Sequence, residues 1–170
     1  MKMFPPLISA QRLLAIAVVT CLTVPWLAAC ATNPATGERM ISIMSPEEEQ
    51  RIGAQESPKA VQEFGGLYQD PELTRYIDGI GQLLARTTET PDQKFTFVVI
   101  DSDIVNAFAL PGGYVHVTRG LLALANNEAE AAGVIAHEIG HVVARHAASR
   151  TSQATLSSGL AALAGAVLGS

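Results

Sequence analysis

The stretch Asn126–Ala148 reads N-N-E-A-E-A-A-G-V-I-A-H-E-I-G-H-V-V-A-R-H-A-A, and its pattern determines how the rest of the chain is interpreted. Asn126 or Asn127 can cap a helix, and Glu128 and Glu130 place negative charge in the first turn, where the helix dipole favours it. Apolar residues then recur at helical spacing, at Val134, Ile135, Ile139, Val142 and Val143. The stretch therefore predicts a helix with one buried face.

Three polar residues within this stretch, His137, Glu138 and His141, form the pattern H-E-x-x-H. Residues four apart lie one above the other on a helix, so both imidazoles can point at a single zinc ion. Glu138 lies about 100° further round the helix, where its carboxylate can reach a water molecule beside the metal. The pattern predicts one Zn²⁺ per chain, bound by His137 and His141, with Glu138 as the general base that hydrolyses a peptide bond. A chance H-E-x-x-H in an unrelated structural lipoprotein is the alternative.

The first 29 residues have the composition of a signal peptide. Lys2 and Arg12 flank a polar start, and an apolar run without a charge, Leu13–Leu27, follows. The run is short for a membrane span. Residues 27–30, L-A-A-C, resemble the lipobox of bacterial lipoproteins, which implies cleavage before Cys30 and a lipid on its sulfur. A plain secretory signal with an incidental Cys30, or an uncleaved anchor, are the alternatives.

The residue after Cys30, the cysteines and the net charge indicate where the protein is located and which partners are excluded. Ala31 follows the lipobox cysteine, and the resemblance then implies sorting to the outer membrane, with the protein facing the periplasm. Cys21 and Cys30 are the two cysteines, so the chain after cleavage has no disulfide. The net charge is −5 and there is no basic stripe, which argues against nucleic acid as a partner.

The order of expected elements predicts an α+β fold rather than an alternating βαβ one. Ser45-Pro46 and Asp70-Pro71 are two helix starts, the first helix ending near Ser57-Pro58 or by Gly65-Gly66. The expected strands are Lys94–Asp101, Asn106–Leu110 and Tyr114–Thr118, the last two forming a hairpin through Pro111-Gly112-Gly113. We expect residues 1–29 to be a signal peptide, 30–44 a tether and 45–170 one domain.

The hairpin carries two further candidates. A strand edge near such a site can hold an extended substrate by main-chain bonding, which makes Asn106, Gly112 and Gly113 candidate substrate-binding residues. A tight turn that needs glycine explains the same residues equally well. His116 alternates with apolar neighbours, so we expect it on the opposite, more often solvated, strand face.

Several segments together resemble the zinc metallopeptidases of the CAAX prenyl endopeptidase, or HtpX-like, family. They are Asn106–Gly113, Val117–Leu122, Asn127–Glu130, Ala136–Val142 and Arg145-His146. The lipobox and N-P-A-T-G at residues 33–37 resemble its outer-membrane lipoprotein, BepA-like, branch. The resemblance implies a zincin-like fold, with helices around a small sheet and a β-hairpin before the H-E-x-x-H helix. It also implies a third zinc ligand, a glutamate on a later helix.

The chain departs from that pattern, because no Asp or Glu follows Glu138. His146 would lie about 140° round a continuous helix from His141 and point away from the zinc. It would then be a surface residue or a neighbour of a ligand. Glu130 lies about 10 Å up the helix axis, too far to bind the same ion.

The last residues, 157–169, are apolar and small, and as a helix they would need burial between other helices or, as a weaker alternative, a membrane. We therefore expect the chain to be the N-terminal part of a longer protein. A naturally short, inactive chain is the alternative.

The sequence thus predicts a zinc metalloendopeptidase, and the resemblance implies misfolded or stalled envelope proteins as substrates. The rival hypothesis is a non-catalytic, chaperone-like or binding lipoprotein on the same fold, without a third zinc ligand. The discriminating feature is a glutamate-bearing helix after Ser170.

Overall fold

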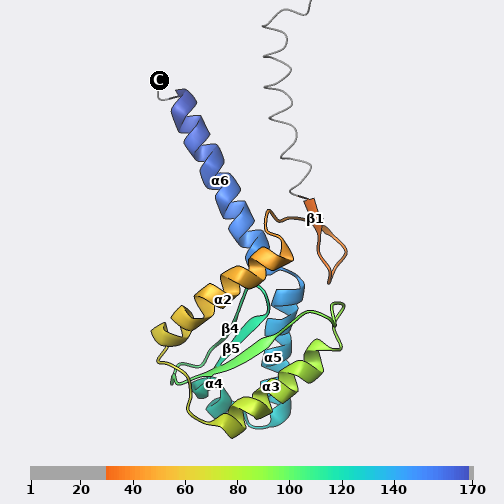
Figure 1. Cartoon of the computed structure of the whole chain (residues 1–170), viewed down its shortest axis with the longest axis vertical. Coiled ribbons are helices and arrows are strands. Elements are labelled where there is room, and N and C mark those ends of the chain that lie inside the picture. Colours follow the sequence, from red (N-terminus) through yellow and green to blue (C-terminus); the bar gives the residue numbers. More distant parts are fainter. Residues whose placement is uncertain (1–29, 169–170) are drawn as a thin grey trace, which may run out of the picture.

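The computed structural model describes residues 30–168 of the chain (Figure 1). The predicted signal peptide therefore lies outside the described residues. After it, β1 (Cys30–Thr32) and β2 (Arg39–Ile41) pair antiparallel. The segment expected to be a tether thus contains a two-stranded hairpin, closed by the turn at residues 33–38.

Two helices follow, and both begin at the predicted caps. In α2 (Pro46–Glu63), the Ser45 side chain accepts a hydrogen bond from the Glu48 N–H, and in α3 (Pro71–Ala85) Asp70 caps the first turn. The first helix does not end at Ser57-Pro58: it continues through Pro58 and ends at Glu63, before Gly65 and Gly66, both of which have positive φ.

The sheet has three strands, β3 (Thr96–Ile100), β4 (Ala107–Leu110) and β5 (Tyr114–Thr118), in the order β3-β5-β4. The predicted hairpin is present as the antiparallel pair β4–β5, and β3 runs parallel to β5. This order puts β5 in the centre and leaves β4 at an edge. The predicted α+β class is confirmed.

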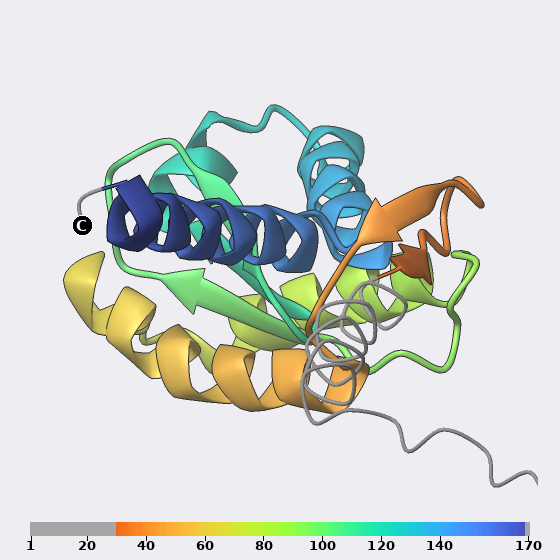
Figure 2. The same ribbon diagram turned by 90° about the horizontal axis from the view of Figure 1, so that it is seen from above.

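Three helices complete the chain: α4 (Arg119–Leu124), α5 (Glu128–Val143) and α6 (His146–Leu168). Helices α3 and α5 pack against one face of the sheet, and Figure 2 shows α2 and α5 on opposite sides of it. The apolar core lies on the α3–α5 side of the sheet and includes Ile77, Phe97, Val117, Ile135 and Ile139. Burying one such isoleucine contributes roughly 2 kcal/mol, so these contacts hold α5 firmly against the sheet.

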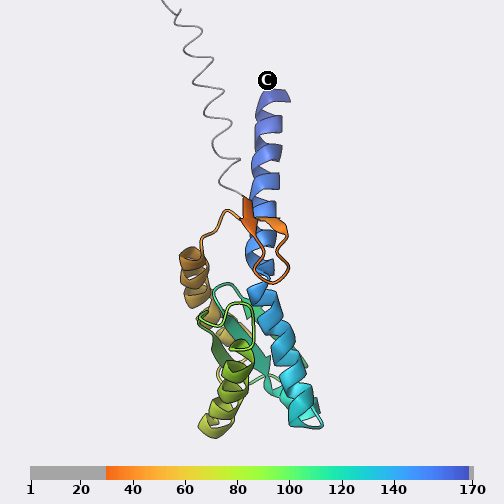
Figure 3. The ribbon, with the colours of Figure 1, turned by 90° about the vertical axis from the view of Figure 1, so that its right-hand side faces the viewer.

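Helix α6 leaves the domain body, as both Figure 1 and Figure 3 show. Its first turns are fixed, since the Ser152 hydroxyl is fully buried and accepts a hydrogen bond from the Ile43 N–H at 3.0 Å. The side chains described beyond it, at residues 153–159, 161 and 162, are exposed. Among residues 30–168, no helix combines the length and apolar character needed to cross a membrane.

Candidate active site

The H-E-x-x-H residues lie on α5, whose orientation is set by its cap and its buried face. The Asn127 side chain accepts a hydrogen bond from the Glu130 N–H, so Asn127 is the N-cap. Ile135, Ile139 and Val142 are buried against the core. Since this face is committed to the core, the histidines of α5 lie beside it.

His137 and His141 are brought together as the helical spacing predicts. Their ring centroids are 4.6 Å apart, with the ring planes at 76°. Glu138 is only 8% exposed, whereas His137 is exposed. The two imidazoles are therefore placed on one face, beside a largely buried carboxylate.

A pocket of about 220 Å³ lies between α5, α6 and the edge strand β4. Glu138, His141 and Arg145 line one side of it, and Ala107–Gly112 line the other. Glu49 of α2 also reaches this pocket. Glu138 and His141 thus share one cavity with the sheet edge.

The predicted position of His146 is wrong, because α5 does not continue through it. The helix ends at Val143, and Arg145 has φ 52°, the left-handed region that non-glycine residues rarely adopt. The chain turns there and α6 begins at His146. As a result His146 lies against His141, with 2.7 Å between their Nδ1 atoms and 4.9 Å between ring centroids. Partial burial, the neighbouring His141 and Arg150 all lower the pKa of His146.

The turn at Arg145 between α5 and α6 forms a corner of the chain. An ion pair that the sequence did not indicate stabilises this corner. Arg145 donates from Nε to Glu49 Oε1 at 2.7 Å and from Nη2 to the same oxygen, and Nη2 also donates to the Met44 carbonyl at 2.7 Å. Glu49 is 5% exposed. Burial raises the pKa of Glu49, and the hydrogen bonds and charge of Arg145 oppose that rise. No sequence signal joins these residues, which lie 96 positions apart.

The three candidate substrate-binding residues all take part in the architecture of the hairpin. The Asn106 N–H and carbonyl are both hydrogen-bonded to Thr118. Gly112 and Gly113 have φ of 77° and 92°, and a Cβ on either would lie within 2.5 Å of backbone atoms of Gln50 or Lys94. Their turn role is therefore visible in the contacts, and Gly112 additionally lines the pocket.

Comparison with known proteins agrees with this geometry. The profile described as Peptidase family M48 matches residues 71–170. The chain belongs to peptidase family M48. The matched residues contain the sheet, the hairpin and the H-E-x-x-H helix.

Curated relatives include proteases from bacteria and mitochondria. The chain is 42% identical to the beta-barrel assembly-enhancing protease of Escherichia coli K12 over 82 residues, 48% of this chain and 17% of that protein. A provisionally named counterpart from Vibrio cholerae is 44% identical over 105 residues, 58% of this chain and 21% of that protein. The mitochondrial metalloendopeptidase OMA1 of Schizosaccharomyces pombe is 31% identical over 119 residues, 69% of this chain and 35% of that protein. The chain thus spans about a fifth of the bacterial relatives.

Membership of M48, a metallopeptidase family, implies a metal cofactor. The site supplies two of the ligands that such a metal needs, because the His137 and His141 rings lie on one helix face with their centroids 4.6 Å apart. Catalytic zinc commonly takes three protein ligands. Within residues 30–168, no group of three or more His, Cys, Asp and Glu side chains is placed to hold a metal ion. Glu130, as expected, is engaged at the start of α5 by Asn126.

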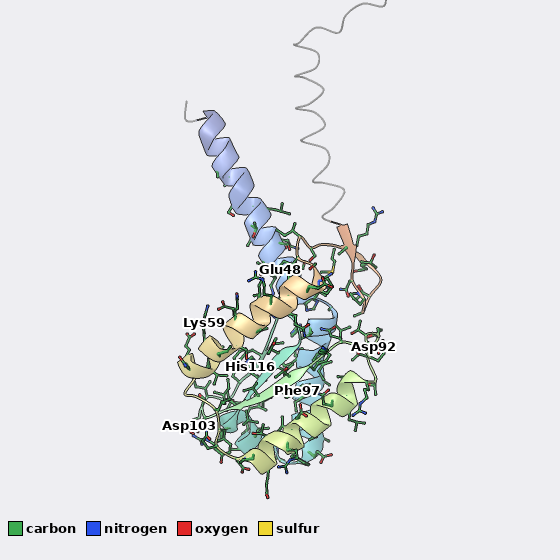
Figure 4. All side chains as sticks on the ribbon, viewed as in Figure 1. Glu48, Lys59, Asp92, Phe97, Asp103 and His116 are labelled. Atoms are coloured by element: carbon green, nitrogen blue, oxygen red, sulfur yellow. The ribbon has the colours of Figure 1, made fainter. Side chains whose placement is uncertain are left out.

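The M48 chain also contains a buried histidine away from this pocket, and here the expectation of a solvated face is wrong. His116 is fully buried between the sheet and α2 (Figure 4). It stacks on Phe108 at 4.7 Å, and its Nε2 lies 2.9 Å from the Ser57 hydroxyl. Its Nδ1 has no hydrogen-bond partner in the described part of the chain. Burial lowers the pKa of His116 to about 4, so this imidazole is neutral.

Proposed function

We propose that this chain is the catalytic region of a zinc-dependent metalloendopeptidase that degrades envelope proteins in protein quality control. The observation that supports this proposal best is the pairing of the His137 and His141 rings on one face of α5, with Glu138 and His141 lining a pocket beside an edge strand. Relatives named as metalloendopeptidases support peptide-bond hydrolysis. Relatives named for β-barrel assembly support an envelope substrate.

In this proposal His137 and His141 hold one Zn²⁺, which would supply a Lewis acid to polarise the scissile carbonyl and activate water. Glu138 takes a proton from the attacking water and passes it to the leaving amine nitrogen. Glu138 is largely buried and lines the same pocket as His141. The two ligands and the base are thus contributed by a single helix.

Strand β4 supplies a way to hold the substrate. Its inner edge is paired with β5, and the pocket lies along Ala107–Gly112. An extended polypeptide could add to the sheet there and place a peptide bond over Glu138. Asn106 and Gly113 then act indirectly, by fixing the ends of this hairpin, and Gly112 lies on the pocket wall.

The metal requirement tests this function directly. The whole protein should lose cleavage of an unfolded protein substrate when a chelator removes its metal, and should recover it on addition of one equivalent of Zn²⁺. Mg²⁺ is a control, because an imidazole site selects zinc over this hard, oxygen-preferring ion. Undiminished cleavage in metal-free protein would contradict the proposal.

We also propose that the protein is an outer-membrane lipoprotein facing the periplasm, exported with a cleaved signal peptide and lipidated on Cys30. The sequence L-A-A-C at residues 27–30 and the apolar run before it support this location. Incorporation of labelled palmitate into the wild-type protein, and its loss in Cys30→Ser, would be the expected result. A Cys30→Ser protein that still carries the label would contradict it.

The edge strand β4 beside the pocket would equally suit a second candidate function, a chaperone-like or binding lipoprotein on the same fold. Such a protein would bind unfolded clients at β4 and bind zinc weakly. Zinc content near one per chain together with cleavage would exclude it.

A further inference from the structure

The contact between His141 and His146 is close enough to be a hydrogen bond, with one ring as donor and the other as acceptor. Their Nδ1 atoms are 2.7 Å apart, which is a hydrogen-bond distance. One proton therefore lies between the two nitrogens, with one ring as donor and the other as acceptor. Two nitrogens bound to the same tetrahedral zinc would be about 3.3 Å apart at ordinary zinc–nitrogen distances. The contact is better explained as a hydrogen bond than as two ligands of one ion.

This hydrogen bond leaves His141 with one free nitrogen, Nε2. A metal bound at Nε2 needs a neutral ring, so the proton of His141 must be on Nδ1. Nδ1 is then the donor to His146, and the proton of His146 is on its own Nε2. Ligand histidines are held in one tautomer and one orientation by this kind of outer partner.

We infer that His146 is a positioning residue that orients His141 for metal binding, and that the Glu49–Arg145 ion pair places His146 there. The inference rests on the proposed metal site. It adds two roles to that site. His146 accepts a hydrogen bond from His141, and the ion pair stabilises the turn that positions His146.

The corner explains why His146 can reach His141 at all. Five positions along an unbroken helix would separate the two residues by about 140°. The left-handed backbone of Arg145 cancels that rotation by turning the chain between α5 and α6. For a residue with a side chain this conformation costs about 1 kcal/mol or more, so it needs compensating contacts.

The compensating contacts come from the segment before α2 and from the first turn of that helix. Arg145 binds both Glu49 and the Met44 carbonyl. The next turn of α6 is held by the hydrogen bond from the Ile43 N–H to Ser152. Residues 43–49 therefore contact the turn itself and the part of α6 that follows it, and a change there should reach His141 through His146.

Two substitutions at His146 test the acceptor role. Asn places Oδ1 close to the position of the His Nδ1, so His146→Asn keeps an acceptor, whereas His146→Leu removes it. Zinc affinity, measured by competition with a chelator in the whole protein, should fall about 10–100-fold in His146→Leu. His146→Asn should recover most of that loss. Equal losses in the two variants would overturn the inference.

X-ray absorption of bound zinc separates this role from direct ligation. The number of imidazoles on the metal should be the same in wild type, His146→Asn and His146→Leu. One imidazole fewer in the variants would show that His146 is itself a ligand, and would overturn the inference while leaving the metalloprotease proposal intact.

A measurement without metal separates failure of the inference from failure of the proposed function. Nitrogen-15 NMR of metal-free protein above pH 8 should show His141 protonated on Nδ1 in wild type, with that preference lost in His146→Leu. Protonation of His141 on Nε2 in the wild type would overturn the inference. A protein that binds no zinc but shows the Nδ1–H tautomer would contradict the proposed function and not the hydrogen bond.

The role of the ion pair is also tested by zinc affinity, with a matched control variant. Glu49→Gln should weaken zinc binding in wild type and have little further effect in His146→Leu, because it acts through His146. Glu56→Gln removes an exposed acid of the same helix, 2.8 Å from Lys59, and should leave zinc affinity unchanged. Additive losses from Glu49→Gln and His146→Leu would overturn the role of the ion pair.

Discussion

Arg145 forms an ion pair with Glu49, 96 residues earlier in the chain, and this pair fixes the only left-handed non-glycine backbone among residues 30–168. The side chains of Glu49 and Arg145 are 7% and 16% exposed. The pair therefore joins the start of α2 to the turn that ends the H-E-x-x-H helix. It lies on the wall of the pocket that contains Glu138.

Loss of Arg145 should destabilise the fold, and the size of the loss should depend on which residue replaces it. Replacing Arg145 alone leaves a buried carboxylate without its counter-ion, so Arg145→Gly should destabilise the fold by about 3 kcal/mol in urea unfolding. Arg145→Ala should cost about 1 kcal/mol more, because alanine disfavours φ 52° and glycine does not. Equal stability of the two variants would show that the left-handed backbone does not persist.

The turn after β4 should be intolerant of a side chain. Gly112→Ala meets Gln50 Cα at 2.4 Å in addition to a φ of 77°. Gly37→Ala has a similar φ of 71° and nothing within 4 Å, so it pays for the backbone conformation alone, about 1 kcal/mol. Thermal unfolding of both variants should show a clearly larger loss for Gly112→Ala. Similar losses would mean that the contact between the turn and α2 is absent.

Buried His116 should make the protein less stable in acid. Its folded-state pKa of about 4 is below the 6.5 of an unfolded chain, so the unfolded state binds more protons between these values. The contribution of neutral His116 to the free energy of unfolding is complete above pH 6.5 and is lost as the pH falls towards 4. The loss amounts to about 3 kcal/mol at most. Unfolding free energies at pH 4.5 and 7.5 should differ less in His116→Gln, which can still bond Ser57. An unchanged difference would rule out His116 as the source.

Much of this fold follows from local sequence patterns. Ser45 and Asp70 next to proline specified two helix starts, and the alternating residues around Pro111-Gly112-Gly113 specified the β4–β5 hairpin. His137 and His141 were predictable as a pair because four-residue spacing on a helix has one geometric outcome. These features depend on neighbours in the chain.

The features that the sequence did not reveal depend on distant contacts. The corner at Arg145 carries no glycine or proline, and it is held by Glu49 and Met44, so an unbroken helix was the natural expectation and it placed His146 wrongly. His116 alternates like a solvated residue, but α2 covers that face of the sheet and Ser57 meets its imidazole. Packing between separate elements, not local preference, decided both cases.

Glu138 is proposed to act as the general base beside a metal held by His137 and His141. The most direct test compares zinc content and proteolysis of Glu138→Gln and His137→Ala in the whole protein. Glu138→Gln should keep about one zinc per chain and lose at least roughly 100-fold in cleavage rate, because both histidine ligands remain and the base is gone. His137→Ala should lose both zinc and cleavage. Substantial cleavage by Glu138→Gln with zinc bound would contradict the role of Glu138 as general base.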